Sequence, residues 1–170
     1  MLSANALAET PKRGGRLRLG WYTHSANDTL EPGRVTTSHD FIRVYQVMNT
    51  LVRWDRGLNP IPDLAVSWEG SNGNNTWHFE LRKGVQFHNG KDFTAADVVD
   101  SVNQHRGPDT KSIIKGWLAG LTDVKADGDH VVRMDLEAPN ADLPMYFGAM
   151  HASIHPEGVR GEEFDKGMGT

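Results

Sequence analysis

The spacing of apolar residues along the chain predicts a mixture of short helices and short strands. One helix is predicted between residues 38 and 51, where five apolar residues share a face: Phe41, Val44, Tyr45, Met48 and Leu51. Ser38 or Asp40 is expected to cap its first turn. A second helix is expected directly after Thr94, because Thr94 and Asp97 have the spacing of a capping box.

Other segments alternate between apolar and polar residues, or carry β-branched and aromatic residues between turn signals, as strands do. Strands are expected at residues 16–19, 64–68, 76–81, 85–87, 121–125 and 131–137, with a short third helix at 143–147. No strand–helix–strand repeat and no glycine fingerprint for nucleotides accompanies them. The fold class is therefore predicted to be α+β (α/β), with a small antiparallel meander and flanking helices.

Charge and composition argue against several classes of function. The chain has 170 residues, with 18 Lys and Arg against 22 Asp and Glu, so its formal net charge is −4. Because no block of basic residues is present, a nucleic-acid partner is not expected. No apolar run reaches the roughly 18 residues that a membrane-spanning helix needs. The absence of cysteine excludes thiol catalysis and cysteine-based zinc sites.

The first residues contain a pattern typical of a secretory leader. Ala6, Leu7 and Ala8 have the small-x-small form after which signal peptidases cut, which would leave Glu9 as the first residue. A charged segment and an apolar segment do not precede this pattern. Residues 1–13 are interpreted as the remnant of a signal peptide, with a disordered alanine-rich leader as the alternative.

Two histidines have a spacing that metal sites use. On a helix, His151 and His155 would point the same way, and Glu157 is the nearest third ligand. Pro156 would end such a helix at once, and zinc sites usually need three or four protein ligands. A surface position for both histidines is therefore favoured over a metal site, and no cofactor is expected.

A catalytic reading finds little support. A hydrolase could draw on a set of histidines, carboxylates and serines: His78, His88, Glu80, Asp92, Ser101 and Ser112. None of them lies in a G-x-S-x-G or H-E-x-x-H motif, so an enzyme is not expected. Trp68 and Trp77 fall in predicted strands, whereas Trp21 and Trp117 fall in irregular segments, where an indole either packs in the core or walls a binding cleft.

Three motifs in the middle of the chain are more specific than these patterns: PDLAVSWE at residues 62–69, FELRKGVQFHNG at 79–90 and FTAADVV at 93–99. They resemble the family 5 extracellular solute-binding proteins, the peptide- and nickel-binding receptors of bacterial ABC importers. Residues 14–18 and 28–32 are similar to the mature N-terminus of that family, and residues 51–55 are similar to its segment before a proline pair. The resemblance covers about residues 14–150.

The resemblance implies a two-lobed periplasmic binding protein fold of class II-like type. Family members are roughly three times this long, so the chain is expected to be an N-terminal fragment. Its expected parts are a leader (1–13), the beginning of the first lobe (14–57), a smaller subdomain beside it (58–166) and the start of the return to the first lobe (167–170). Because a first strand without its partners would be poorly held, residues 58–150 are expected to be the better-ordered unit.

The resemblance also implies the function. Such receptors trap a peptide or a similar small solute between two lobes and present it to a membrane permease in the periplasm, without chemistry. In the segment after the first strand, His24, Ser25 and Asn27 are expected to hold the backbone of the ligand, with Trp21 as an aromatic wall. Trp117 is expected to contribute from a second contact region.

Three other functions remain open from the sequence. The first is a nickel or metal-chelate receptor of the same family, in which His24 or His151 would ligate the metal. The second is a metal-dependent hydrolase, and the third is a module whose only partner is another protein. Saturable binding without turnover would favour a receptor, and metal-dependent activity would favour the hydrolase.

Overall fold

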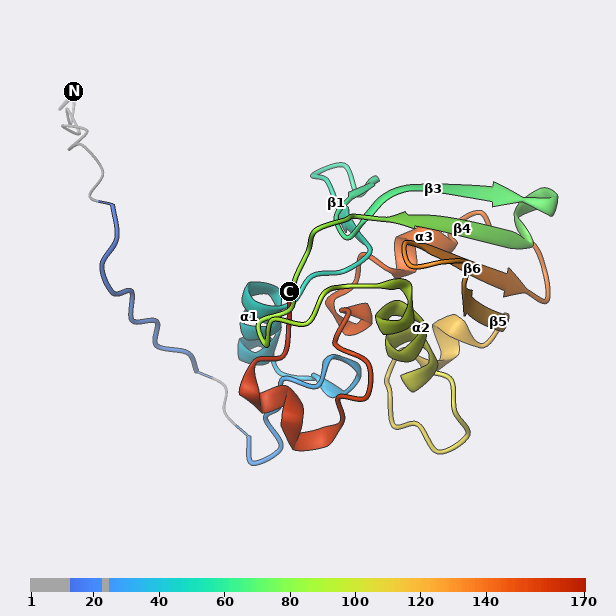
Figure 1. The fold of residues 1–170 in the computed structure, drawn as a ribbon. Coiled ribbons are helices and arrows are strands. Elements are labelled where there is room, and N and C mark those ends of the chain that lie inside the picture. Colours follow the sequence, from blue (N-terminus) through green and yellow to red (C-terminus); the bar gives the residue numbers. More distant parts are fainter. Residues whose placement is uncertain (1–12, 23–24) are drawn as a thin grey trace, which may run out of the picture.

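The computed structural model describes residues 13–22 and 25–170, which form a chain of short helices and strands (Figure 1). The helices and strands are α1 (Ser38–Val47), β1 (Val52–Trp54), β2 (Pro60–Pro62), β3 (Ala65–Ser71), β4 (Thr76–Leu81), α2 (Ala95–Gln104), β5 (Leu121–Ala126), β6 (Val131–Leu136) and α3 (Leu143–Tyr146). Short 3₁₀ turns lie among them: η1 (Pro32–Arg34), η2 (Asn72–Asn74), η3 (Lys115–Leu118), η4 (Met150–Ala152) and η5 (Gly161–Lys166).

Four strands form an antiparallel sheet in the order β3–β4–β6–β5, and α2 packs against β5 and β6 (Figure 1). In the register of the sheet, Phe79 of β4 lies opposite Trp68 of β3 on one side and Val132 of β6 on the other. A separate two-stranded ribbon pairs β1 with β2. The predicted α+β architecture with local antiparallel strands is confirmed.

The main core lies between this sheet and α2. Trp77, Phe79 and Leu81 alternate along β4 and are all buried, as their period of two requires. Val98 and Val102 of α2 are buried in the same cluster, which removes their apolar surface from water. The alternation that predicted β4 therefore also identified the face on which the core is built.

The beginning of α2 matches its sequence pattern. A capping box joins Thr94 and Asp97, and the backbone N–H of Thr94 donates to Asp97 Oδ2 over 2.9 Å. Asp97 is fully buried, yet its other carboxylate oxygen accepts from Lys91 Nζ and from the backbone N–H of Glu157. A buried carboxylate is tolerated because each of its oxygens has partners. Asp97 thereby also anchors the C-terminal segment to the helix.

A second, smaller core surrounds α1. Buried apolar residues from the N-terminal and the C-terminal thirds of the chain meet in it: Leu30, Val35, Val44, Met48, Met150, Val159 and Phe164. Hydrogen bonds reinforce the contact, since the Leu30 N–H donates to Asp165 Oδ1 at 2.9 Å and the Ile154 N–H donates to the Asn49 carbonyl at 2.9 Å. The division expected at residues 57 and 58, between the beginning of the first lobe and the smaller subdomain, stays a prediction.

The structure corrects several expectations near the N-terminus. Residues 16–19 form no strand, and Leu17 and Leu19 are 80% and 65% exposed, because no neighbouring strand pairs with them among the described residues. Figure 1 shows this segment as an extended trace that leaves the folded body. The N-cap of α1 is Thr37 rather than Ser38 or Asp40.

One further expectation about a short element is wrong, and one short strand lies where the sequence does not predict it. Residues 85–87 form no full strand, since their pairing is limited to a single bridge between Gln86 and Asp92. Conversely, the two prolines of β2 lie in a strand, which is possible because a two-stranded ribbon leaves one side of each strand unpaired. None of the helices in the described ranges combines the length and the hydropathy needed to cross a bilayer.

Candidate functional site

Trp21 lies beside the beginning of α1. Its indole Nε1 donates to Ser38 Oγ at 3.0 Å, and its ring stacks on Tyr22 with the centroids 6.0 Å apart. The side chain is 48% exposed. It lines a small pocket with Leu19, His39, Ile42, Arg43 and Gln46. Trp21 is thus attached to the surface of α1, with part of its ring available to a ligand.

Ser25 and Asn27 form a tight turn that Asp28 closes. The Asn27 N–H donates to Ser25 Oγ at 3.1 Å, and the Ser25 N–H donates to Asp28 Oδ2 at 3.0 Å. The hydroxyl oxygen of Ser25 already accepts one bond within the turn, whereas Asn27 is exposed. His24 lies outside the described residues. Two of the predicted ligand contacts therefore lie on one turn, next to Trp21 along the chain.

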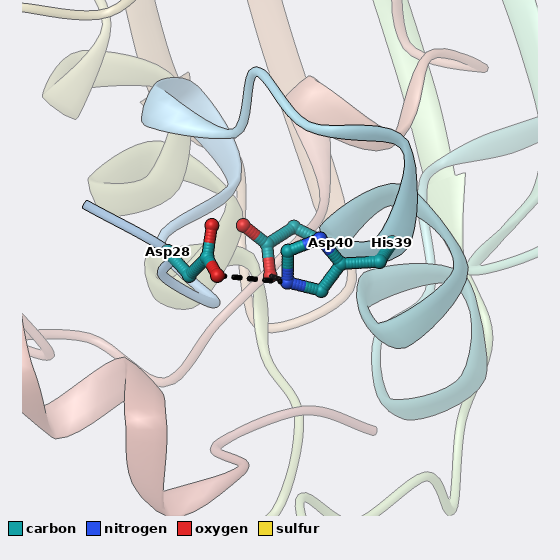
Figure 2. A group of neighbouring side chains, drawn as sticks. All are labelled: Asp28, His39 and Asp40. Carbon is teal, nitrogen blue, oxygen red and sulfur yellow. Dashed lines mark ion pairs between the residues drawn. The ribbon is translucent and has the colours of Figure 1, made fainter. Parts of the chain in front are cut away.

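A group of three side chains fixes this turn to α1. Figure 2 shows Asp28, His39 and Asp40 pointing toward one another. His39 Nε2 lies 3.0 Å from Asp28 Oδ2 and 3.2 Å from Asp40 Oδ1, and one ligand atom from each residue lies within 4.8 Å of the others. Imidazole and carboxylate groups at such distances are a donor set that a divalent metal accepts.

Asp40 is the most strongly held member of this group. Its carboxylate is almost fully buried and accepts from Arg43 at 2.8 Å, from the Thr37 hydroxyl at 2.9 Å and from the Thr29 N–H at 3.3 Å. The guanidinium of Arg43 balances part of the negative charge of the group. These bonds give the group a structural role, because they connect the turn that carries Ser25 to the first turn of α1.

Trp117 lies in η3 on another part of the surface and is 47% exposed. Its ring centroid is 6.2 Å from that of Tyr146 and 6.4 Å from that of His151, whose ring meets it edge-on. Trp54 lies beside them, and its indole Nε1 donates to the Met145 carbonyl at 3.1 Å. Trp54, Trp117, Met145 and Tyr146 together line an open groove of about 370 Å³, which we call the aromatic groove.

A second hollow, the polar pocket, shares Trp54 with the aromatic groove. Its volume is about 270 Å³, and it is lined by Tyr45, Met48, Asn49, Thr50, Arg53, Trp54, Asp63 and Gly148. Asn49 Nδ2 donates to both carboxylate oxygens of Asp63, at 3.0 and 3.1 Å, and Arg53 Nε lies 3.9 Å from the same carboxylate. The aromatic rings of the groove and the polar side chains of the pocket are therefore neighbours on this surface.

The histidine pair at 151 and 155 is not a surface pair. His155 is 1% exposed and meets the Phe164 ring edge-on at 5.0 Å, and His151 is half-buried with Nε2 3.2 Å from the Val35 carbonyl. Burial lowers the pKa of both imidazoles. The one potential metal-binding group among the described side chains does not include either histidine or Glu157. The expected surface position is wrong for His155, which packs in the smaller core against Phe164, and His151 is half-buried.

The residues considered for a hydrolase are dispersed. His78 and Glu80 lie on β4, while Ser101 is buried within α2 and its Oγ contacts the His155 carbonyl at 3.3 Å. Ser112 Oγ does lie 2.8 Å from a histidine, His105 Nδ1.

That serine–histidine contact is poorly suited to catalysis. Burial, with smaller contributions from His155 and His151, lowers the pKa of His105 to about 4, which makes it a weak base near neutral pH. Among the described residues, Ser112 is hydrogen-bonded to the His105 ring and no carboxylate is. The arrangement therefore differs from a triad, in which a third group orients the base.

Comparison with known proteins decides the family. Residues 59–170 match the model of the bacterial extracellular solute-binding proteins, family 5, middle region. The chain belongs to this family. The resemblance found in the three central motifs is thus confirmed, and the fold agrees with that of periplasmic binding proteins of known structure.

Relatives of known sequence or structure are much longer than this chain. The uncharacterized protein YhjP of Bacillus subtilis is 32% identical over 153 residues, which are 88% of this chain and 26% of YhjP. The solute-binding protein MoaA of A. tumefaciens R10, solved with mannopinic acid, is 31% identical with a TM-score of 0.70, over 75% of this chain and 27% of MoaA.

A third relative has a peptide bound. DppA of Helicobacter pylori, an ABC transporter-associated periplasmic binding protein solved with the peptide STSA, is 26% identical with a TM-score of 0.63. The match covers 75% of this chain and 28% of DppA. The chain thus spans about a quarter of the length of these relatives.

Sequence reasoning had missed Trp54, Tyr146 and the group formed by Asp28, His39 and Asp40. The two aromatic residues come from β1 and α3, which are distant in sequence from Trp117 and from each other. The LVRWD segment that carries Trp54 was recognised only as part of the family pattern. Asp28 and Asp40 lie close in sequence to the predicted ligand-binding segment and to His39. Their negative charge near a histidine is the signal in the sequence that could have indicated this group.

Proposed function

We propose that this chain is part of a periplasmic receptor of an ABC importer that binds a peptide, or a similar small solute, and delivers it to a membrane permease. Membership of family 5 supports the class of function. DppA with its peptide and MoaA with mannopinic acid support small polar ligands with backbone-like or carboxylate groups. The receptor binds without turnover, and closure of a cleft retains the ligand.

The observation that carries the proposal is the pair of hollows that share Trp54. Ligand sites of this kind are concave and largely apolar, with a few polar groups that orient the ligand. The aromatic groove offers rings, and the polar pocket offers Asn49, Thr50 and the Arg53–Asp63 pair. The two lie next to each other because Trp54 belongs to both.

Five residues are proposed as ligand contacts. Trp21, His24, Ser25 and Asn27 would meet the ligand from the segment before α1, and Trp117 would meet it from η3. A tight turn with an exposed Asn27 offers amide groups to the backbone of a peptide, and Trp21 and Trp117 present half-exposed rings. Trp117 has the additional support of the aromatic groove.

Native mass spectrometry of the gently purified protein tests the proposal, because receptors that close over a ligand release it slowly. We expect a series of added masses that match peptides or one small solute, and that disappear after partial unfolding and refolding. A bare protein that also fails to bind peptides in equilibrium dialysis would contradict the receptor function. Turnover of the bound solute would favour an enzyme instead.

A metal or metal-chelate receptor is the second candidate, and the geometry of Asp28, His39 and Asp40 is the observation that favours it. Titration calorimetry with Ni²⁺ would test it in the chain and in the variants H39A and H78A. His78 lies on the sheet, away from this group, and serves as the control. Binding that His39→Ala removes and His78→Ala preserves would support a metal receptor. If both variants bind Ni²⁺, or if neither variant binds it, the metal-receptor function is contradicted.

A further inference from the structure

We propose that the aromatic groove is a subsite for the aromatic side chain of a peptide ligand. The proposal rests on the function proposed above and specifies which side chains such a receptor prefers. It is carried by the rigidity of the rings that line the groove, by their chemistry, and by the polar pocket beside them.

Trp54 is held rigidly, although it is 38% exposed. Its indole N–H donates to the Met145 carbonyl, so the polar end of the side chain is already satisfied. Gly148 permits this position, because a Cβ atom at residue 148 would collide with the indole ring of Trp54. A fixed ring with an open face needs no ordering when a ligand binds, which favours affinity.

Trp117 and Tyr146, which also line the groove, are preorganised too. Trp117 and Tyr146 are tilted by 44° with their centroids 6.2 Å apart, and His151 meets Trp117 at 87°. The hydroxyl oxygen of Tyr146 accepts from Asn140 Nδ2 at 3.4 Å, which fixes the far end of that ring. The polar ends of Trp54 and Tyr146 are thus already bonded, and their rings present aromatic surface to the groove.

The lining determines the class of ligand group. Three aromatic rings and one methionine line the groove, and none of its lining side chains carries a formal charge. A carboxylate or an ammonium group would lose its hydration there without gaining a charged partner. An aromatic ring instead gains edge-to-face or offset contacts with the indoles and a favourable contact with the methionine sulfur.

The polar pocket explains why the ring would belong to a peptide. It adjoins the groove at Trp54 and is lined by polar side chains. Asn49 and Thr50 are already bonded to Asp63, Thr170 and the Val52 carbonyl, whereas the Arg53 side chain is 64% exposed and can donate to a peptide carbonyl or a terminal carboxylate. A free aromatic hydrocarbon would not use Arg53.

Nuclear magnetic resonance of the five tryptophan indole N–H signals tests the subsite directly. The probes are N-acetyl-phenylalaninamide and, as the matched control, N-acetyl-alaninamide. We expect the phenylalanine derivative to shift the signals of Trp54 and Trp117 and to leave those of Trp68 and Trp77 in place. The alanine derivative should produce at most small shifts at Trp54 and Trp117, because it offers no ring.

Substitution separates the subsite from a general loss of structure. We expect Trp117→Ala to weaken the binding of N-acetyl-phenylalaninamide by about threefold to tenfold, as the loss of one aromatic contact does. Trp68→Ala, on the sheet, is the control and should leave the affinity unchanged. If Trp117→Ala unfolds the chain, Trp117→Leu retains the apolar volume, removes the ring and should still weaken binding.

The outcomes distinguish this subsite from the proposed receptor function. Unmoved Trp54 and Trp117 signals, or equal affinity for both derivatives, would overturn the subsite. If trialanine nevertheless shifts the backbone amide signals of residues 25–29, the chain still binds a peptide and the receptor function is supported. A subsite that binds the phenylalanine derivative in a protein that binds no peptide would instead contradict the receptor function alone.

Discussion

The sheet region (residues 65–136) and the α1 region (residues 25–48 with 150–168) are held together in different ways. In the sheet region, β3 pairs with β4 and β5 pairs with β6 across short turns, whereas the pairing of β4 with β6 joins segments distant in sequence. In the α1 region, the Leu30 N–H bonds to Asp165 and the His151 ring lies against the Val35 carbonyl. These partners are 135 and 116 residues apart.

The difference bears on function, because the proposed binding surfaces depend on contacts between segments that are distant in sequence. The turn that carries Ser25 is fixed to α1, and the Phe41 ring of α1 contacts His151 at 5.5 Å. His151 in turn supports Trp117. The smaller core around α1 thus connects the segment before α1 to the aromatic groove, and loosening it should affect both.

The largest difference between the two regions is expected when one aromatic side chain is removed from each core. Phe79 and Phe164 are both fully buried, in the main core and in the second core. Each substitution to alanine should cost about 3–5 kcal/mol of unfolding free energy. We expect Phe79→Ala to reduce hydrogen-exchange protection throughout the chain, and Phe164→Ala to reduce it mainly in the α1 region.

Loss of protection everywhere in Phe164→Ala would show that the two cores unfold as one unit. The unsubstituted chain supplies the reference for both variants. In it, residues 58–150 are expected to be better protected than the first 50 residues, and equal protection would contradict that expectation.

Acid should act where the two regions meet, because His105 follows α2 in the sheet region, whereas His151 and His155 belong to the α1 region. The pKa of His105 is lowered from 6.5 to about 4 by burial, with smaller contributions from the nearby His155 and His151, whose pKa values are lowered too. A lowered imidazole pKa means that the unfolded chain binds more protons, so stability is present above about pH 6.5 and is lost as the pH falls toward 4.

For His105 alone this loss is on the order of 2–3 kcal/mol. Urea unfolding at several pH values between these limits measures it. Asp100, whose pKa is lowered chiefly by its hydrogen bond to Arg160, lies 4.0 Å from His155 Nδ1 and partly opposes the effect there. His105→Gln removes one titrating group, so its stability should fall less steeply with acid. An unchanged slope would show that His105 is not responsible.

Removing helix caps offers a smaller test of the same comparison. Thr94 begins α2 in the sheet region, and Thr37 begins α1, where its hydroxyl donates to Asp40 at 2.9 Å. Thr94→Ala, which removes a capping box, should cost about 1 kcal/mol, measured by chemical unfolding, whereas Thr37→Ala removes the bond of the hydroxyl to the Asp40 side chain. We expect Thr37→Ala also to loosen the turn that carries Ser25. Equal exchange rates in that turn before and after the change would contradict this connection.

An exposed ion pair should have the smallest effect. Lys125 and Asp123 lie 3.1 Å apart on β5, and both side chains are about half exposed. Because water and salt screen such pairs, Lys125→Ala should change the unfolding free energy by less than about 0.5 kcal/mol. A larger loss would mean that Lys125 contributes apolar contacts of its stem.

Local signals in the sequence predicted most of the sheet region and the helix α1, and failed for two segments outside both regions, the β1–β2 ribbon and residues 16–19. The capping box at Thr94 and the alternation along residues 76–81 act within a few residues, so they could be recognised without knowing the fold. The ribbon of β1 and β2 was missed because its prolines disfavour strands in general. The strand at residues 16–19 was expected wrongly, because alternation alone does not supply a partner strand.

The candidate site shows the same limit. The resemblance to family 5 implies Trp117 as a ligand contact, the irregular segment alone leaves core packing equally open, and in the structure Trp117 lines a groove. Its companions Trp54 and Tyr146 could not be selected, since the contact between them forms only when β1, η3 and α3 pack together. Asp40 was considered only as a helix cap, and its bonds to Thr29 and Arg43 depend on the path of the loop.

Hydrogen exchange with and without a mixture of short peptides tests the central claim most directly, because it reports binding and its location together. We expect slower exchange in residues 25–29 and 112–118 when peptides are present, and unchanged exchange in β3 and β4. Peptides that protect no segment, or that protect only the sheet, would contradict the assignment of a ligand site to the segment before α1 and to Trp117.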